Sequence, residues 1–345
     1  GMQDDDPDFA TDLAESFASM IPFVGGAVAK LGKLWGLYFV DLAIEELEKE
    51  WVAVPPADRV IRFNTTATAP NGDMAHTVGD PAFLKSGLGG SGQDVVISYV
   101  DVTRLPTAVE DAVLGNAPPG VPIPPTRLVG NEGANRLTGN DAANKLVASG
   151  GNDTAAGGLG DDEVAGNLGN DLLVGGVGLD RLVGGPGDDR LAGGVDADTL
   201  LGGPGADSLL GDAGDDLLSG GDGADTLVGG EGADRMRGGA DADRFVFLAP
   251  GAADRVTDFV VAQDLLVFGA AAFGGGLTPG TLGPSSFVAQ AGLDAASPAG
   301  VGQFIYHTTS GALLWDADGT GGAAAVQVAI LSGRPAISAS DFLLV

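Results

Sequence analysis

The stretch from Gly157 to Val183 reads GGLGDDEVA, GNLGNDLLV, GGVGLDRLV, three nine-residue units that follow one another without a gap. Each unit begins with Gly, has Asp at its sixth position and has an apolar residue at its eighth. The same nonapeptide continues in both directions and gives thirteen in-phase units, from Gly130 to Val246. A short fixed period of this kind indicates a repeat architecture, in which neighbouring units together bury one core.

The spacing within the unit predicts its conformation. Gly at the first, second and fourth positions adopts backbone angles that other residues avoid, so the first six residues form a tight turn. The last three residues form a short strand, whose eighth residue points inward because side chains alternate along a strand. Two units make one 18-residue coil, so that units i and i+2 stack on the same side.

The sixth position places carboxylates in two columns along this stack. Neighbouring carboxylates about 5 Å apart repel each other by about 3 kcal/mol at an effective dielectric constant of 20. Burial of one Leu contributes roughly 1.5–3 kcal/mol in the opposite direction, so the ionised stack does not fold alone. A hard divalent cation between turns reverses this balance, and flexible oxygen ligands suit Ca2+ better than Mg2+.

These units resemble the G-G-x-G-x-D-x-U-x nonapeptide of RTX calcium-binding proteins, which are exported by type I secretion systems. The resemblance implies a mainly β fold, a parallel β-roll of the right-handed β-helix type. It also implies Ca2+ between turns i and i+2, held by turn carbonyls and sixth-position side chains. Thirteen units allow at most eleven such sites, nine of them with Asp on both sides. The implied metal ligands are Asn135, Asn144, Asp153, Asp162, Asp171, Asp180, Asp189, Asp198, Asp207, Asp216, Asp225, Asp234 and Asp243.

Some units depart from the pattern. Asn135 and Asn144 are neutral, so we expect the first one or two sites to be weak or empty. Ala142, Asp196 and Asp241 replace the fourth-position Gly. The two aspartates are compatible with the turn, because Asp tolerates left-handed backbone angles better than most residues.

The alternative to a roll is a disordered low-complexity segment. Residues 130–247 contain 22 acidic and 7 basic residues, and very few aromatic residues. The apolar eighth position is present in every unit, which favours the folded roll when calcium is bound. Without calcium, we expect this segment to be disordered.

The charge of the whole chain excludes several functions. Its 345 residues include 47 acidic and 17 basic ones, for a net charge of −30. Nucleic-acid binding is excluded, because phosphate contacts need Lys and Arg. The chain has no Cys and two His, which excludes disulfides, thiolate catalysis and His-rich metal sites.

Composition divides the chain into four predicted regions. Residues 1–54 form an N-terminal helical hairpin, and residues 55–125 form a mixed α/β or β region that ends in a Pro-rich linker. Residues 126–247 form the roll, and residues 248–345 form a β-rich C-terminal cap with the secretion-signal region.

The regions before the roll leave several interpretations open. The hydrophobic residues 9–51 have three possible roles: they pack into a protein core, act on a membrane or form a partner-binding helix. No motif supports membrane contact. GGSGQDVVI, at residues 89–97, is an out-of-phase nonapeptide and forms either a calcium turn or a hairpin turn before a strand. His76 has no nucleophile beside it, and we interpret it as structural.

The region after the roll predicts more β structure. Residues 242–268 form strands that close the open end of the roll, and residues 304–345 contain three strand-like runs. Asp316, Asp318 and Gly319 form a turn, either a plain one or one that holds a further cation. The ending Asp341–Val345, an acid followed by apolar residues, resembles the C-termini of type I exoproteins.

Together these features predict a secreted, extracellular calcium-binding RTX protein, or the C-terminal module of one. Association of the protein with the cell surface is an alternative. Its partners are calcium ions and, through its C-terminus, the type I secretion machinery. The acidic start of the chain lacks a secretory signal, which agrees with that route. The alternatives are the C-terminal part of a secreted hydrolase and a membrane-active cytolysin-like or surface protein acting through residues 9–51. No catalytic constellation occurs in the chain, so an enzyme is disfavoured but remains open.

Overall fold

The computed structural model describes residues 60–63, 95–98, 102, 104–105, 110–116, 126–251, 253–291, 302–318 and 325–345, and only the backbone of the first two segments. The chain divides into two compact units, with a boundary between Pro204 and Gly205. We call the described residues up to Pro204 the upstream unit and those from Gly205 onward the downstream unit. The predicted helical hairpin (1–54), His76 and most of residues 64–125 lie outside the described residues.

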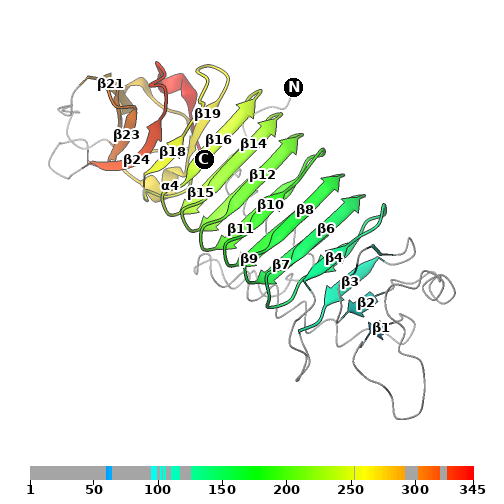
Figure 1. Cartoon of the computed structure of the whole chain (residues 1–345). Coiled ribbons are helices and arrows are strands. Elements are labelled where there is room, and N and C mark those ends of the chain that lie inside the picture. Colours follow the sequence, from blue (N-terminus) through cyan, green and yellow to red (C-terminus); the bar gives the residue numbers. More distant parts are fainter. Residues whose placement is uncertain are drawn as a thin grey trace, which may run out of the picture. The chain divides into compact units, whose positions relative to one another are not determined.

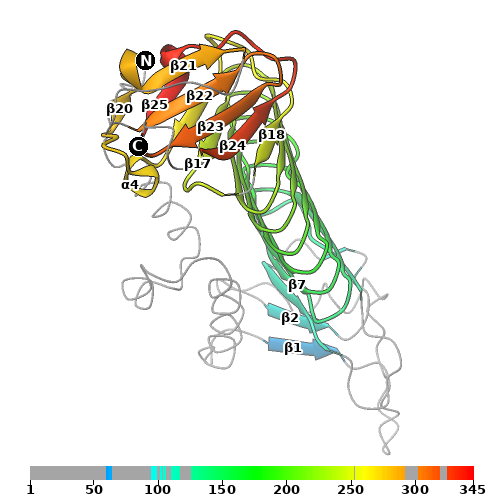
Figure 2. The same ribbon diagram turned by 90° about the vertical axis from the view of Figure 1, so that its left-hand side faces the viewer.

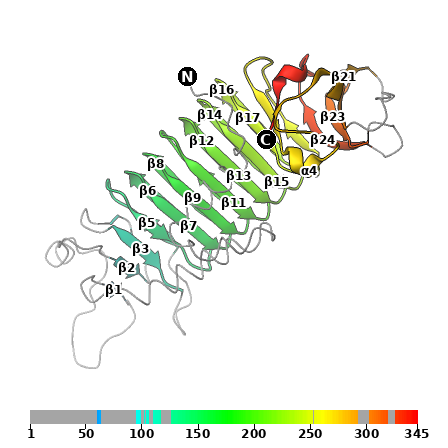
Figure 3. The same ribbon diagram turned by 180° about the vertical axis from the view of Figure 1, so that it is seen from behind.

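The upstream unit consists of two parallel sheets, which appear from opposite sides in Figure 1 and Figure 3. One sheet has the strand order β1-β2-β3-β5-β7-β9-β11 and the other has the order β4-β6-β8-β10-β12. The strands are β1 (Val60–Phe63), β2 (Val95–Ser98), β3 (Asp111–Leu114), β4 (Arg127–Val129), β5 (Arg136–Thr138), β6 (Lys145–Gly150), β7 (Thr154–Leu159), β8 (Glu163–Leu168), β9 (Leu172–Val177), β10 (Arg181–Val183), β11 (Arg190–Val195) and β12 (Thr199–Pro204).

The register of these sheets follows the nonapeptide. Leu173 in β9 pairs with Leu191 in β11, and Leu182 in β10 pairs with Leu200 in β12, always 18 residues apart. All thirteen eighth-position side chains are fully buried, with an exposed fraction of 0%. The predicted mainly β fold and parallel β-roll are confirmed, since the repeat region is a parallel β-solenoid whose core is this apolar row.

The strands are longer than the pattern predicts. We expected three residues, but most strands have six, because parallel pairing resumes at the second position of the next unit, as in Gly158–Gly176. A Cβ added to Gly176 would lie only 2.0 Å from the carbonyl oxygen of Gly158. Close stacking of successive coils therefore requires Gly here, and this Gly has a φ of 126°.

Strands outside the nonapeptides join the same sheet. β3 pairs in parallel with β5, so that Ala112 lies beside Leu137. β1 and β2 pair in parallel on the other side of β3. β2 includes the strand that we predicted at the end of residues 89–97, whereas the turn before it lies outside the described residues.

The downstream unit contains the rest of the solenoid and a β-rich cap. Its sheets have the orders β13-β15-β17-β19-β25-β20 and β14-β16-β18-β24-β23-β22-β21. The strands are β13 (Ser208–Ala213), β14 (Leu217–Asp222), β15 (Thr226–Glu231), β16 (Arg235–Ala240), β17 (Arg244–Phe247), β18 (Asp254–Val256), β19 (Leu265–Phe268), β20 (Gly280–Thr281), β21 (Phe287–Gln290), β22 (Gln303–His307), β23 (Ala312–Asp316), β24 (Val326–Leu331) and β25 (Phe342–Leu344). The α-helix α4 (Ala270–Phe273) and the 3-10 helices η2 (Pro284–Ser286) and η3 (Ala339–Asp341) are short.

The cap covers the last solenoid strands (Figure 2). β24 pairs in parallel with β18, and β25 pairs in parallel with β19. β22, β23 and β24 form an antiparallel meander beside them. The rings of Phe268 and Phe342 stack, and Phe304 packs against both at a tilt and also contacts Trp315. The tail therefore has four strands where we expected three, because Phe342–Leu344 also pairs with the sheet.

Candidate metal centre

The sixth-position carboxylates form a ladder along the upstream unit and another along the downstream unit. Oδ1 of Asp171 accepts the backbone N–H of Asp153 at 2.8 Å, and Oδ1 of Asp180 accepts that of Asp162 at 2.7 Å. In the downstream unit, Oδ1 of Asp225 accepts the N–H of Asp207 at 2.8 Å. Each aspartate thus reaches back 18 residues to the coil before it. The repeat period, with each turn stacked on the previous one, places these side chains.

The other carboxylate oxygen has no hydrogen-bond donor within the described structure. These aspartates are 1–2% exposed, so this oxygen does not face bulk solvent. The aspartates whose Oδ2 is buried in this way, with no hydrogen bond among the described residues, include Asp153, Asp162, Asp171, Asp180, Asp225 and Asp243. Buried polar atoms are normally paired, so this repeated exception indicates that another group belongs beside them.

The first Gly of each unit shows what surrounds that oxygen. A Cβ added to Gly157 would lie 2.2 Å from Oδ2 of Asp162 and 2.7 Å from the carbonyl oxygen of Gly175. The equivalent point at Gly166 lies 2.1 Å from Oδ2 of Asp171 and 2.9 Å from the carbonyl oxygen of Gly184. The carboxylate oxygen and a carbonyl oxygen of the next stacked coil therefore lie around one point. Both are acceptors only, which is the donor set that a hard cation prefers.

Burial makes these carboxylates costly to ionise. Burial raises the pKa of Asp162 from 3.8 to about 8, although the Asn144 amide lowers it and Asp180 adds to the rise. Burial likewise raises the pKa of Asp153, Asp180 and Asp225 to about 7. These shifts correspond to roughly 4–6 kcal/mol against the charged form. The folded repeats therefore need protons or cations at these positions.

A comparison with protein-family models agrees with this geometry. The model described as "RTX calcium-binding nonapeptide repeat (4 copies)" matches residues 127–155, 147–182, 165–200, 174–209, 183–218 and 210–245. Residues 127–245 are RTX calcium-binding repeats. The chain thus carries the calcium-binding repeats of RTX proteins. No curated protein matches the chain.

The RTX turns differ from a compact metal cluster. No three His, Cys, Asp or Glu side chains gather around one point in the part of the chain that the structure describes. A cation between two turns therefore needs backbone oxygens in addition to one or two carboxylates. The first-position carbonyls provide such oxygens, since the carbonyl oxygens of Gly175 and Gly184 lie beside Oδ2 of Asp162 and Asp171. The residues present fit Ca2+, which accepts mixed carboxylate and carbonyl ligands.

The two substituted aspartates adopt the expected left-handed angle. Asp196 has a φ of 78° and Asp241 a φ of 72°, so both replace the fourth-position Gly without changing the turn. At Ala142 the N–H donates to Oδ1 of Asn140 at 3.0 Å, just as the N–H of the fourth-position Gly133 donates to Oδ1 of Asn131 at 2.8 Å.

The first two RTX turns are closed by hydrogen bonds of their own. Oδ1 of Asn135 accepts the N–H of Asn131 at 2.8 Å, while its Nδ2 donates to the carbonyl oxygen of Glu110 at 3.2 Å. Oδ1 of Asn144 accepts the N–H of Asn140, and its Nδ2 donates to Oδ1 of Asn140. The amide group thus provides the donor that the aspartates lack. This pattern agrees with the expectation that the first sites are weak or empty.

The ladder continues beyond the thirteen RTX units, which our sequence reading missed. Oδ1 of Asp254 accepts the N–H of Asp234 at 3.0 Å, 20 residues away. Oδ1 of Asp264 accepts the N–H of Asp243 at 3.1 Å, 21 residues away. In the sequence, each of these two acids is followed by apolar residues, as in the repeats. The loops before them are longer, so the two acids do not fit the nine-residue period.

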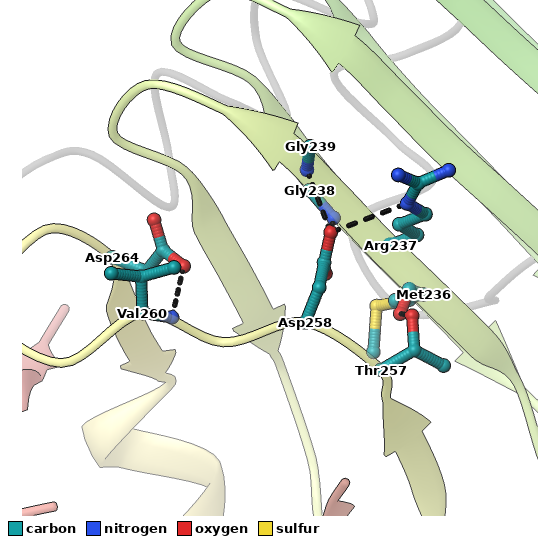
Figure 4. Close-up of polar contacts among 8 residues, drawn as sticks. All are labelled: Met236, Arg237, Gly238, Gly239, Thr257, Asp258, Val260 and Asp264. Atoms are coloured by element: carbon teal, nitrogen blue, oxygen red, sulfur yellow. Dashed lines mark hydrogen bonds and ion pairs between the residues drawn. The ribbon is translucent and has the colours of Figure 1, made fainter. Parts of the chain in front are cut away.

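After the last RTX unit, carboxylates also satisfy backbone amides directly (Figure 4). Oδ1 of Asp258 accepts the N–H of Gly238 at 3.0 Å, and Oδ2 accepts that of Gly239 at 3.1 Å. Arg237 lies 3.4 Å from the same carboxylate. Oδ2 of Asp264 accepts the N–H of Val260 at 2.7 Å. Here side-chain oxygens replace the carbonyls that a further coil would offer.

The remaining candidates lie away from the ladder. Oδ1 of Asp316 accepts the Asp318 N–H at 3.3 Å, as in a plain turn, and Gly319 lies outside the described residues. Asp341 is 1% exposed, and its carboxylate accepts the backbone N–H groups of Ala262 and Ser338. This acid therefore anchors the cap. Within the described residues, no helix has the length and apolar character to cross a membrane.

Proposed function

We propose that Ca2+ ions bind between stacked turns and that this binding folds the repeats. The ligands are the sixth-position aspartates from Asp153 to Asp243 together with turn carbonyls, and the nine Asp–Asp pairings are the main sites. The observation that supports this most directly is the buried Oδ2, which meets a carbonyl oxygen and no donor. A cation removes both the repulsion between acceptors and the cost of ionising a buried carboxylate.

The same energetics make the repeats a calcium switch. Without the cation, the buried charges oppose folding, and the acidic segment stays unfolded. With the cation, the free energy of binding becomes free energy of folding. Sites that fill at roughly 10⁻⁴–10⁻³ M Ca2+ suit an extracellular protein. An unfolded chain in the cytosol is suited to threading through a type I exporter, as the RTX resemblance implies.

A far-UV circular dichroism titration tests the switch. Calcium-stripped protein is titrated with Ca2+ and, separately, with Mg2+. We expect a cooperative rise in β signal near millimolar Ca2+ and little change with Mg2+. A fully folded solenoid in excess chelator would contradict the proposal.

Two neighbouring variants give the matched control. Asp162→Asn removes a buried ladder charge, whereas Asp161→Asn removes an exposed charge one residue away. We expect Asp162→Asn to raise the calcium midpoint several-fold and Asp161→Asn to leave it nearly unchanged. Equal effects would mean that overall charge, and not the ladder, controls folding.

A further inference from the structure

The downstream unit ends its two rows of turns in different ways. One row ends with Asp243 and then Asp264, and the other ends with Asp234 and then Asp254. At the first end, both oxygens of Asp264 accept backbone N–H groups, from Asp243 and Val260. Asp258 fills the place of the next coil by accepting two further amides (Figure 4). Protein hydrogen bonds therefore hold both oxygens of Asp264, the last acid of this row, although Oδ2 of Asp243 is buried without a donor.

The second end keeps the pattern of the repeats. The β16–β18 pairing places Arg235 beside Arg255 and Met236 beside Val256, so Asp254 takes the sixth position of a further coil. The Arg255 N–H donates to the carbonyl oxygen of Asp234 at 2.7 Å, just as the Arg244 N–H donates to that of Asp225 at 2.8 Å. Oδ1 of Asp254 accepts the Asp234 N–H at 3.0 Å.

An unsatisfied oxygen lies at this second end. Oδ2 of Asp234 is buried and accepts no N–H group among the described residues, and the Asp234 and Asp254 carboxyl groups lie within hydrogen-bond reach of each other. This oxygen lies on the inner side of its turn, because a Cβ on Gly229 would be 2.1 Å away. Asp254 is 6% exposed, so two buried carboxylates lie on adjacent coils.

We infer that Asp234 and Asp254 hold one more Ca2+ ion, at a site outside the RTX nonapeptides. This inference rests on the proposed function, since it assumes that the ladder binds calcium. The three atoms nearest to a Cβ on Gly229 all belong to Asp234, whereas the equivalent point at Gly157 also has the carbonyl oxygen of Gly175 nearby. Fewer carbonyls therefore reach the ion, and water completes its coordination. This site is the weakest of its row and the last to fill.

Native mass spectrometry of the full chain at increasing Ca2+ tests the inference by counting bound ions. We expect Asp254→Asn to bind one ion fewer than the wild type at saturation. The matched control is Asp258→Asn, which removes one charge at the end of the neighbouring row; we expect it to keep the wild-type count and to lower the melting temperature. The same count in Asp254→Asn as in the wild type would overturn the inference.

Two further measurements distinguish failure of this inference from failure of the proposed function and from misfolding of the variant. A wild type that binds no Ca2+ would refute the proposed function itself. If Asp254→Asn fails to gain β signal in calcium, Asp254→Glu keeps the charge and serves instead. We expect Asp254→Glu to change the affinity of the last ion alone, by several-fold. Unchanged affinity for that ion would again exclude Asp254 as a ligand.

Discussion

At the scale of single residues, the repeat works through the contrast between donors and acceptors. Asp and Asn are almost the same size, yet they leave different atoms beside the turn. Asn144 contributes an N–H group that bonds Asn140, whereas Asp162 leaves a buried oxygen without a donor. One atom therefore separates a turn that is complete by itself from a turn that is suited to a cation.

The first prediction concerns the first-position Gly. Gly157→Ala places a Cβ 2.2 Å from Oδ2 of Asp162, so the carboxylate must move out of its position. We expect lower calcium affinity at that turn and a destabilisation of a few kcal/mol, measured by thermal melting in saturating Ca2+. Gly251→Ala is the control, because its Cβ meets open space. Equal melting temperatures for the two variants would contradict this account.

The second prediction concerns pH. Burial raises the pKa of Asp153 from its ordinary value of 3.8 to about 7 in the folded repeats. Between these values the folded state binds more protons than the unfolded state, so the stability of the calcium-free repeats falls as pH rises through 7. We expect calcium-free protein to gain β signal from pH 8 to pH 4.5, measured by circular dichroism at low protein concentration.

The same shifts set the pH dependence of calcium binding. Protons compete with Ca2+ for the carboxylates, so calcium affinity decreases below pH 7. Sedimentation checks that the acid state is monomeric, since the isoelectric point is about 4.1. A loss of β signal in acid without calcium would show that desolvation of the carboxylates does not limit folding.

At the scale of elements, each strand depends on the coil beside it. The eighth-position side chain is the main apolar group that a repeat strand buries. Pairing across 18 residues brings these groups into contact, as Leu173 beside Leu191 shows. Strands of three to six residues become stable here only because the parallel sheets continue on both sides.

The third prediction follows from that core. Leu173→Ala removes a fully buried side chain and should cost about 2–5 kcal/mol. Leu168→Ala, in the same region, truncates a side chain that is 58% exposed and should change stability little. Thermal melting in saturating calcium compares the two variants. Similar melting temperatures would mean that calcium, and not the apolar row, dominates the stability of the coil.

At the scale of the whole molecule, the net charge of −30 opposes any compact state. Screening by salt and coordination of a cation reduce this repulsion in different ways. Salt shortens the range of the repulsion between exposed charges, with a Debye length of about 3 Å at 1 M. It does not provide a ligand for buried oxygens.

The fourth prediction separates these two effects. In 0.5 M KCl without calcium, we expect the chain to contract without a gain of β signal, because screening leaves the buried carboxylates without partners. Small-angle scattering measures the contraction, and circular dichroism measures the β content. Folding in KCl to the level seen with calcium would show that general repulsion is the main obstacle.

Sequence alone determined the repeat fold and the carboxylate ladder. The nine-residue phase predicted which residues are buried, and Asp at position six predicted where the acids lie, because both depend on local spacing. Left-handed backbone at Asp196 and Asp241 followed from residue type in the same way. The longer strands were not predicted, since the pairing of Gly158 with Gly176 depends on how closely coils stack.

The tertiary structure decided how the ladder ends. Asp254 and Asp264 lie 20 and 21 residues after their partners, so a search by period does not find them. The role of Asp341 depends on contacts with Ala262, 79 residues away in sequence. Such positions are set by which strands pair at the end of a sheet. Local spacing determines a repeating structure, whereas the ends depend on long-range pairing that no local pattern specifies.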